Sequence, residues 1–216
     1  MAANEKTPNP GRTLSKNRME AFSDGVLAIA ITLLVLDLAV HPPGSPLRQF
    51  LQGWPSYFAY GVSFLTIGAA WVAHNALTDR LDRSDSILLR LNLVFLLVVA
   101  FLPFPTRLVA ESLHDTTDAK RVAVVVYGLT LLAIRLTFYA LDVYSRREHL
   151  RLPGAEDPDL QDERRKFRVV VVAYTVTILI GVLLPLAAVA IYFGIAVFLV
   201  VPFRALTQSL FGKHPQ

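Results

Sequence analysis

Apolar residues along the chain gather into long blocks, which short stretches of charged residues, proline and glycine separate. Each block approaches the roughly 20 residues that an α-helix needs to cross about 30 Å of hydrocarbon. The pattern predicts an all-α integral membrane protein with one transmembrane domain, residues 21–206. We expect six transmembrane helices in it, at about 21–40, 57–77, 87–110, 122–145, 167–184 and 187–206. The rest is predicted to form an N-terminal segment 1–20, a linker at about 146–166 and a tail 207–216.

Proline marks several predicted helix boundaries, because it lacks the backbone N–H that an interior helical residue donates. Residues 41–46, with three prolines and a glycine, predict a short connector. Pro103 and Pro105 predict a kink or an end in the third span. Pro185 lies between the last two blocks, which predicts a tight helical hairpin there. A single long bent helix is the alternative.

The positive charges are distributed unevenly between the two sides of the predicted membrane domain. Of the 21 Lys and Arg residues, Arg48, Arg107, Lys120 and Arg121 fall on one side, and Arg135 falls within a span. The other 16 fall on the side of the N-terminus. The positive-inside rule therefore predicts that both termini are cytoplasmic.

Composition narrows the class of protein further. Hydrophobic residues make up 54% of the chain, against about 45–50% in soluble domains. The basic residues lie between apolar blocks, so they indicate topology, and we expect no nucleic-acid partner. The sequence lacks a Gly-rich phosphate loop, a nucleophile elbow and an HExxH motif. We therefore expect neither an enzyme nor a bound cofactor.

A metal site is likewise not expected. The chain has no cysteine, and its five histidines show no i, i+4 ligand pairing. Four acidic residues of the 146–166 linker offer oxygen ligands but lack the spacing of an EF-hand loop: Glu156, Asp157, Asp159 and Asp162. A solvated linker is the favoured interpretation.

The first predicted span carries an ionisable residue, Asp24, well inside it. Asn17 and Glu20 resemble a capping box and predict a helix start near Asn17, so Asp24 lies about two turns in. An intramembrane carboxylate is costly and marks a functional or a structural site. Polar residues of the second and third spans fall at the same depth, which predicts a buried cluster of Arg18, Ser23, Asp24, Trp71, His74 and Asn92. Helix–helix packing alone would also explain such a cluster.

Farther along the same span, Ile29, Leu33 and Leu36 recur at i, i+4 and i+7, with Thr32 beside them. These residues share one face of a helix. Periodicity cannot distinguish among a lipid-facing, a buried and a pore-lining face. The residues themselves leave these three interpretations open.

Two runs of sequence resemble a known family. They are Arg18 followed by Phe22-Ser23-Asp24-Gly25 and an Ile- and Leu-rich helix, and the third-span run from Asn92-Leu93 to Phe101-Leu102-Pro103-Phe104-Pro105-Thr106. Both resemble the transmembrane protein 175 family of potassium channels, in its short prokaryotic form. The resemblance implies a homotetramer in a prokaryotic cell membrane, with potassium as the permeant ion and the first helix lining the pore.

The resemblance also implies roles for individual residues. The narrowest ring of the pore falls at Ile29, with Leu33 and Leu36 as further layers, and Thr32 influences cation preference. Residues of the polar motif and its neighbours form a packing and gating network: Arg18, Phe22, Ser23, Asp24, Gly25, Trp71, His74 and Asn92.

The expected function is therefore a potassium-permeable leak-type channel with a hydrophobic gate. No Thr-Val-Gly-Tyr-Gly filter is present, so we expect modest selectivity. Asp37 could concentrate cations at the outer mouth or be an ordinary interfacial residue. In the fourth span Arg135, Tyr139 and Asp142 stand at i, i+4 and i+7, and we favour structural pairing for Arg135.

Two alternatives belong to other functional classes. One is a proton-coupled transporter with a relay of Asp24, His74, Arg135 and Asp142. The other is a non-conducting membrane scaffold.

Overall fold

The computed structural model describes residues 16–36, 45, 47, 54–112, 116–152 and 160–200. Several predicted features lie outside these residues. They are the segment before residue 16, the ends of the first and last spans (37–40 and 201–206), Asp37, the connector at 41–44, the acidic stretch 153–159 and the tail 207–216.

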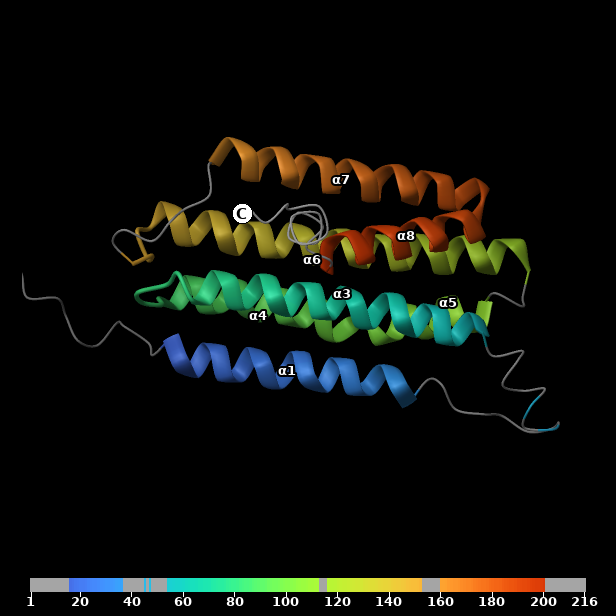
Figure 1. Cartoon of the computed structure of the whole chain (residues 1–216), viewed down its shortest axis with the longest axis horizontal. Helices are drawn as coiled ribbons and strands as arrows, with labels where there is room; N and C mark the ends of the chain where they lie inside the picture. Colours follow the sequence, from blue (N-terminus) through green and yellow to red (C-terminus); the bar gives the residue numbers. More distant parts are fainter. Residues whose placement is uncertain are drawn as a thin grey trace, which may run out of the picture.

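The described residues form helices that run side by side in an elongated bundle (Figure 1). The helices are α1 (Lys16–Leu36), α3 (Trp54–Thr78), α4 (Ser86–Phe101), α5 (Pro103–Ser112), α6 (Thr117–Arg147), α7 (Leu160–Leu183) and α8 (Pro185–Val200). Within this part of the chain, the single β-type pairing is an isolated antiparallel bridge between Leu81 and Arg151. The prediction of an all-α protein is confirmed.

In the part of the chain that the structure describes, five helical segments are long and apolar enough to cross a membrane. They are Lys16–Leu36, Ser56–Thr78, Ser86–Ser112, Thr117–Arg147 and Gln161–Leu183. The apolar helix α8 is shorter, at 16 residues. The helix α1 begins at Lys16, so Asn17 lies within its first turn and does not cap it.

The third predicted span consists of two helices, α4 and α5, that meet at Leu102. Pro103 has no N–H to donate to the carbonyl of Val99, four residues earlier. The N–H of Leu102 donates a hydrogen bond to the Val99 carbonyl instead, with the nitrogen and oxygen 3.0 Å apart. The predicted break at Pro103 therefore has a direct cause in the backbone hydrogen bonds.

The last two helices are separate and fold back on each other as a hairpin (Figure 1). Leu184 alone separates α7 from Pro185, the first residue of α8. Of the two interpretations left open by the sequence, the structure has the hairpin. Two glycines allow close packing here, because a Cβ at Gly128 would collide with Tyr192 and one at Gly181 would collide with Val124. Small residues serve helix packing in membranes in this way.

The helix α1 lies at one edge of the bundle, and α7 lies at the opposite edge (Figure 1). Helix α1 packs against α3 and α4, with a smaller contact to α5. One face of α1 is buried in these contacts, through Met19, Ser23, Leu27, Ala30 and Leu34. The opposite face of α1 has no partner helix among the described residues.

Candidate functional site: the first helix and its polar contacts

A chain of buried hydrogen bonds ties α1 to its two neighbouring helices. Asn92 on α4 donates from Nδ2 to the Ser23 hydroxyl at 2.9 Å, and its Oδ1 lies 2.9 Å from Nε2 of His74 on α3. The Ser23 hydroxyl donates in turn to the carbonyl of Met19 at 2.8 Å. All three side chains are buried. We name Ser23, His74 and Asn92 the inner polar cluster.

The geometry of this cluster determines which nitrogen of His74 carries the proton. The amide nitrogen of Asn92 faces Ser23, so its oxygen faces His74 and accepts a hydrogen bond there. Nε2 is therefore the donor in this contact. Nδ1 is buried and has no hydrogen-bond partner among the described residues. The ring also stacks on Phe95, with centroids 5.8 Å apart.

Asp24 makes a different contact, toward the rim of the helix interface. The indole Nε1 of Trp71 donates to its Oδ1 at 3.0 Å, and both side chains are accessible to some degree. Asp24 is therefore not joined to the inner polar cluster by a hydrogen bond. The single predicted cluster is divided in the structure into two adjacent contacts.

Three residues assigned to that network lie elsewhere on α1. Arg18, Phe22 and Gly25 are exposed, on the face turned away from α3 and α4. Helix geometry accounts for this, since Arg18 precedes Ser23 by five residues and so points about 140° away from it. A Cβ at Gly25 would meet nothing within 4 Å, so close packing inside the subunit does not require this glycine.

The predicted aliphatic stripe lies on this same outward face. Ile29, Leu33 and Leu36 are 60%, 44% and 67% exposed. Thr32 is exposed beside them, and its hydroxyl donates to the carbonyl of Ile29 at 2.8 Å. We name Ile29, Thr32, Leu33 and Leu36 the outer stripe. It lies on one exposed face over the length that the sequence predicts.

Similarity to known proteins identifies the family of this chain. Residues 18–103 match the profile of a family described as "Endosomal/lysosomal potassium channel TMEM175". The chain is 42% identical over 187 residues to the potassium channel B446_29190 of Streptomyces collinus, covering 82% of this chain and 90% of that relative. The chain belongs to the TMEM175 family.

Solved structures of TMEM175 proteins have the same fold. A TMEM175 homologue from Chamaesiphon minutus, described as a lysosomal potassium-selective channel homologue, superposes with a TM-score of 0.71. It is 33% identical, and the match covers 85% of this chain and 95% of that one. The resemblance stated from sequence is confirmed, and this TMEM175-family chain is a multi-pass membrane protein.

A second set of polar contacts holds the end of α6 in this TMEM175 protein. Asp142 pairs with Arg151 at 2.6 Å and with Arg146 at 3.0 Å. The hydroxyl of Tyr144 donates to Asp85 at 2.6 Å, at the start of α4. The pairing with Arg146 is visible in the sequence as an i, i+4 spacing. Arg151 has no such signal, because it lies beyond the end of the helix and returns through the bridge to Leu81.

Arg135, the other charged residue singled out in the fourth span, has no such partner. Its Nε is buried and makes no hydrogen bond with any described residue. Glu163 on α7 is close enough to act on it electrostatically. Tyr139 stacks on Phe167 of α7, and Asp142 pairs with Arg146 and Arg151. The favoured structural pairing of Arg135 is therefore not formed within the described part of the chain.

Metal ligands do not gather in the described ranges, where no three His, Cys, Asp or Glu side chains are grouped to hold an ion. Of the acidic linker residues, Asp162 lies on α7 and pairs with Lys166 at 2.8 Å.

Proposed function

We propose that this protein is a potassium channel whose ion path is lined by the outer stripe of α1. The Streptomyces collinus relative is named a potassium channel, and the Chamaesiphon minutus protein is described as a homologue of a lysosomal potassium-selective channel. Within the family assignment, the observation that carries the proposal is the position of the stripe. It is a row of large aliphatic side chains on a helix whose opposite face holds all the buried contacts.

One helix cannot enclose a water-filled path, so the channel is a homo-oligomer with α1 of each subunit at the shared axis. Closed cyclic symmetry is the usual arrangement for identical subunits around a pore. We propose four subunits, as the resemblance implies. Crosslinking in mild detergent tests this, and a product that stops at the monomer would contradict it.

The stripe supplies a hydrophobic gate. Ile29 and Leu36 are seven residues apart, so their rings would line about 10 Å of the path. A narrow aliphatic ring removes water from an ion and offers no oxygen in return. Ile29 forms the narrowest ring in this proposal, and Leu33 and Leu36 form further layers.

Thr32 supplies the polar element of the path. Its hydroxyl hydrogen is already donated to the carbonyl of Ile29, so the oxygen presents lone pairs to its exposed side. A ring of such oxygens favours a cation without surrounding it completely. This geometry supports a modest preference for potassium.

The inner polar cluster fixes how α1 is held against α3 and α4, and we propose that it acts in packing and gating. Asp24 and Trp71 contribute a second contact at the rim of that interface. Arg18, Phe22 and Gly25 continue the outward face toward the N-terminal end of α1. Their part in gating would be exerted from the pore side of the helix.

The proposed channel resides in a prokaryotic cell membrane with both termini in the cytoplasm. The asymmetry of Lys and Arg between the two sides supports this orientation. Relatives from Streptomyces, Chamaesiphon and Chryseobacterium support a prokaryotic setting. A reporter fused to the C-terminus tests it, since signal on the outer face would reverse the topology.

The transporter alternative requires a proton path from His74 to Arg135 and Asp142. Aromatic rings lie along that direction: His74 stacks on Phe95, and Phe95 packs on Phe138 of α6 at 5.8 Å. Among the described residues, no chain of hydrogen bonds joins His74 to Arg135 or to Asp142. This arrangement favours the channel over the relay.

Planar-bilayer recording of the purified protein under a potassium and sodium gradient tests the proposed function. We expect linear, unsaturated current that reverses on the potassium side of zero. Saturable, proton-dependent and electrically silent uptake would indicate a transporter. Silence in both assays would indicate a scaffold.

A further inference from the structure

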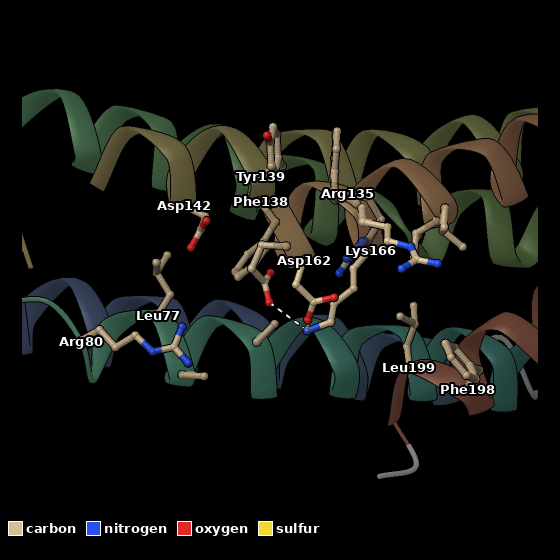
Figure 2. Close-up of a pocket in the computed structure, with 17 residues that line it drawn as sticks. Leu77, Arg80, Arg135, Phe138, Tyr139, Asp142, Asp162, Lys166, Phe198 and Leu199 are labelled. Atoms are coloured by element: carbon tan, nitrogen blue, oxygen red, sulfur yellow. Dashed lines mark hydrogen bonds and ion pairs between the residues drawn. The ribbon is translucent and has the colours of Figure 1, made fainter. Parts of the chain in front are cut away.

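A cavity of about 860 Å³ opens among α3, α6, α7 and α8, away from the outer stripe (Figure 2). It lies toward the C-terminal ends of α3 and α6, on the side where most Lys and Arg residues fall. Arg80 and Asp142 stand at one end of it, and Phe198 and Leu199 of α8 stand at the other (Figure 2). The cavity therefore has a charged end and an apolar end.

Among the described residues, the acids of this cavity form their ion pairs with bases other than Arg80 and Arg135, although Glu163 also acts electrostatically on Arg135. Asp162 and Glu163 both pair with Lys166, at 2.8 and 3.3 Å. Asp142 is held by Arg146 and Arg151, as described above. The buried Nε of Arg135 makes no hydrogen bond with any described residue, and Arg80 lines the same cavity.

Of the residues that line the cavity, Arg135 gives the strongest reason to expect a bound ligand. It lies within a membrane-spanning helix, and its Nε is buried without an acceptor. A charged group at such a depth is costly unless it is paired or serves a site. Guanidinium groups bind phosphate oxygens through two parallel hydrogen bonds. The missing partner is therefore an anion with several acceptor oxygens.

The apolar end of the cavity indicates which anion. Val169, Phe198 and Leu199 line it, and these side chains suit an acyl chain better than a soluble ion. A neighbouring cavity of about 950 Å³ shares Tyr139 and Phe167 with the first. It adds Arg147, Arg164 and Arg168 to the same region. Basic pockets between transmembrane helices on the cytoplasmic side suit anionic lipid headgroups.

We propose that this cavity binds an anionic phospholipid of the leaflet that faces it, with Arg135 holding the headgroup phosphate and Arg80 adding positive charge at the charged end of the cavity. One acyl chain lies along Phe198 and Leu199. The lipid supplies the acceptor that the Nε of Arg135 lacks among the described residues, and it joins α3, α6, α7 and α8 at one site. The proposal does not depend on whether the protein conducts ions.

Native mass spectrometry of the purified full chain tests this, with 1-palmitoyl-2-oleoyl phosphatidylglycerol as the probe and the matching phosphatidylcholine as comparison. We expect the wild type to retain phosphatidylglycerol in preference to phosphatidylcholine. R80Q together with R135Q should weaken phosphatidylglycerol binding by about tenfold or more, because the contact of Arg135 with the phosphate and the positive charge of Arg80 are both lost. R90Q is the matched control, since Arg90 is exposed on α4 and lines neither cavity.

A second variant tests the site independently, in case R135Q fails to fold. Ala76 lines the cavity, so Ala76→Trp fills part of it and leaves every charge in place. We expect the same loss of phosphatidylglycerol binding. Equal retention of the two lipids, or full binding by Ala76→Trp, would overturn the proposal. Displacement of the lipid by millimolar inorganic phosphate would also overturn it, because the site would then recognise a free anion.

Discussion

The two faces of α1 differ in the kind of contact that each makes. The inward face carries Ser23, whose hydroxyl accepts a hydrogen bond from Asn92 and thereby connects α1 to α4 and, through His74, to α3. The outward face carries Ile29, Leu33 and Leu36, which contact no partner helix among the described residues and remain largely exposed. Hydrogen bonds to neighbouring helices hold the inward face, whereas the aliphatic side chains of the outward face make none.

The inward face fixes the direction of the outward one. Ile29 follows Ser23 by six residues, which corresponds to a rotation of about 240° around the helix axis. A helix anchored at Ser23 therefore turns Ile29 away from α4. Rotation by a single residue would move the stripe by about 100°, so the inner polar cluster sets which side chains face the proposed pore.

The largest effect is expected from breaking the inward face. Asn92→Ala removes the acceptor for His74 Nε2 and the donor to Ser23, and it leaves His74 with both ring nitrogens unpaired. Each buried group left unsatisfied costs about 1–3 kcal/mol. We expect a clear fall in the yield of folded oligomer and a midpoint of thermal unfolding lowered by several degrees, measured by size-exclusion chromatography and a thermal shift assay.

A double variant sharpens this prediction. His74→Leu with Asn92→Leu removes both members of the pair, and such a replacement is less damaging than leaving one partner alone. We expect the double variant to be more stable than Asn92→Ala. A lower stability would mean that shape, rather than hydrogen bonding, holds α1 in place.

The next largest effect concerns the outward face. Ile29→Asn places amides around the narrowest proposed ring and lowers the barrier to wetting. A barrier lower by about 1.4 kcal/mol corresponds to a current about tenfold higher. Bilayer recording at matched protein density checks this. Val35→Asn is the control, because Val35 is 50% exposed and lies about 120° around the helix from Ile29.

A smaller effect is expected from Thr32→Ala, which removes one polar ring without opening the aliphatic layers. Current should persist, while the reversal potential under a potassium and sodium gradient moves toward zero. Thr175→Ala on α7 is the matched control, since its exposed hydroxyl makes the same kind of bond, to the carbonyl of Val171 at 2.8 Å. If both variants shifted the reversal potential equally, Thr32 would have no special role.

The smallest effect is expected at Asp24. Its contact with Trp71 is a single hydrogen bond at the rim of the helix interface, outside the inner polar cluster. Asp24→Ala should reduce folded oligomer or alter the open fraction slightly, without changing ion preference. Normal assembly with complete loss of cation preference would instead assign Asp24 to the ion path.

The contrast between the faces also explains what the sequence could predict. The similar depth of Ser23, His74 and Asn92 along the predicted spans was enough to predict their contact. Polar groups inside a membrane need hydrogen-bond partners, and other polar groups at the same depth supply them. Periodicity was enough to align Ile29, Leu33 and Leu36. Depth alone does not place Arg18, Phe22 and Gly25, which share a motif with Ser23 but lie on the exposed side of the helix. Arg151 could not be predicted as a partner of Asp142, because their contact depends on the path of a loop.

Cysteine accessibility tests the central proposal, that the outer stripe lines the ion path, most directly. The natural chain has no cysteine, so Ile29→Cys, Leu33→Cys, Leu36→Cys and Val35→Cys each introduce one thiol per subunit. A small cationic thiol reagent is applied during bilayer recording. We predict lasting loss of current at positions 29, 33 and 36, slowed by high potassium, and little change at position 35. Equal loss at position 35, or unchanged current at all three stripe positions, would contradict the account.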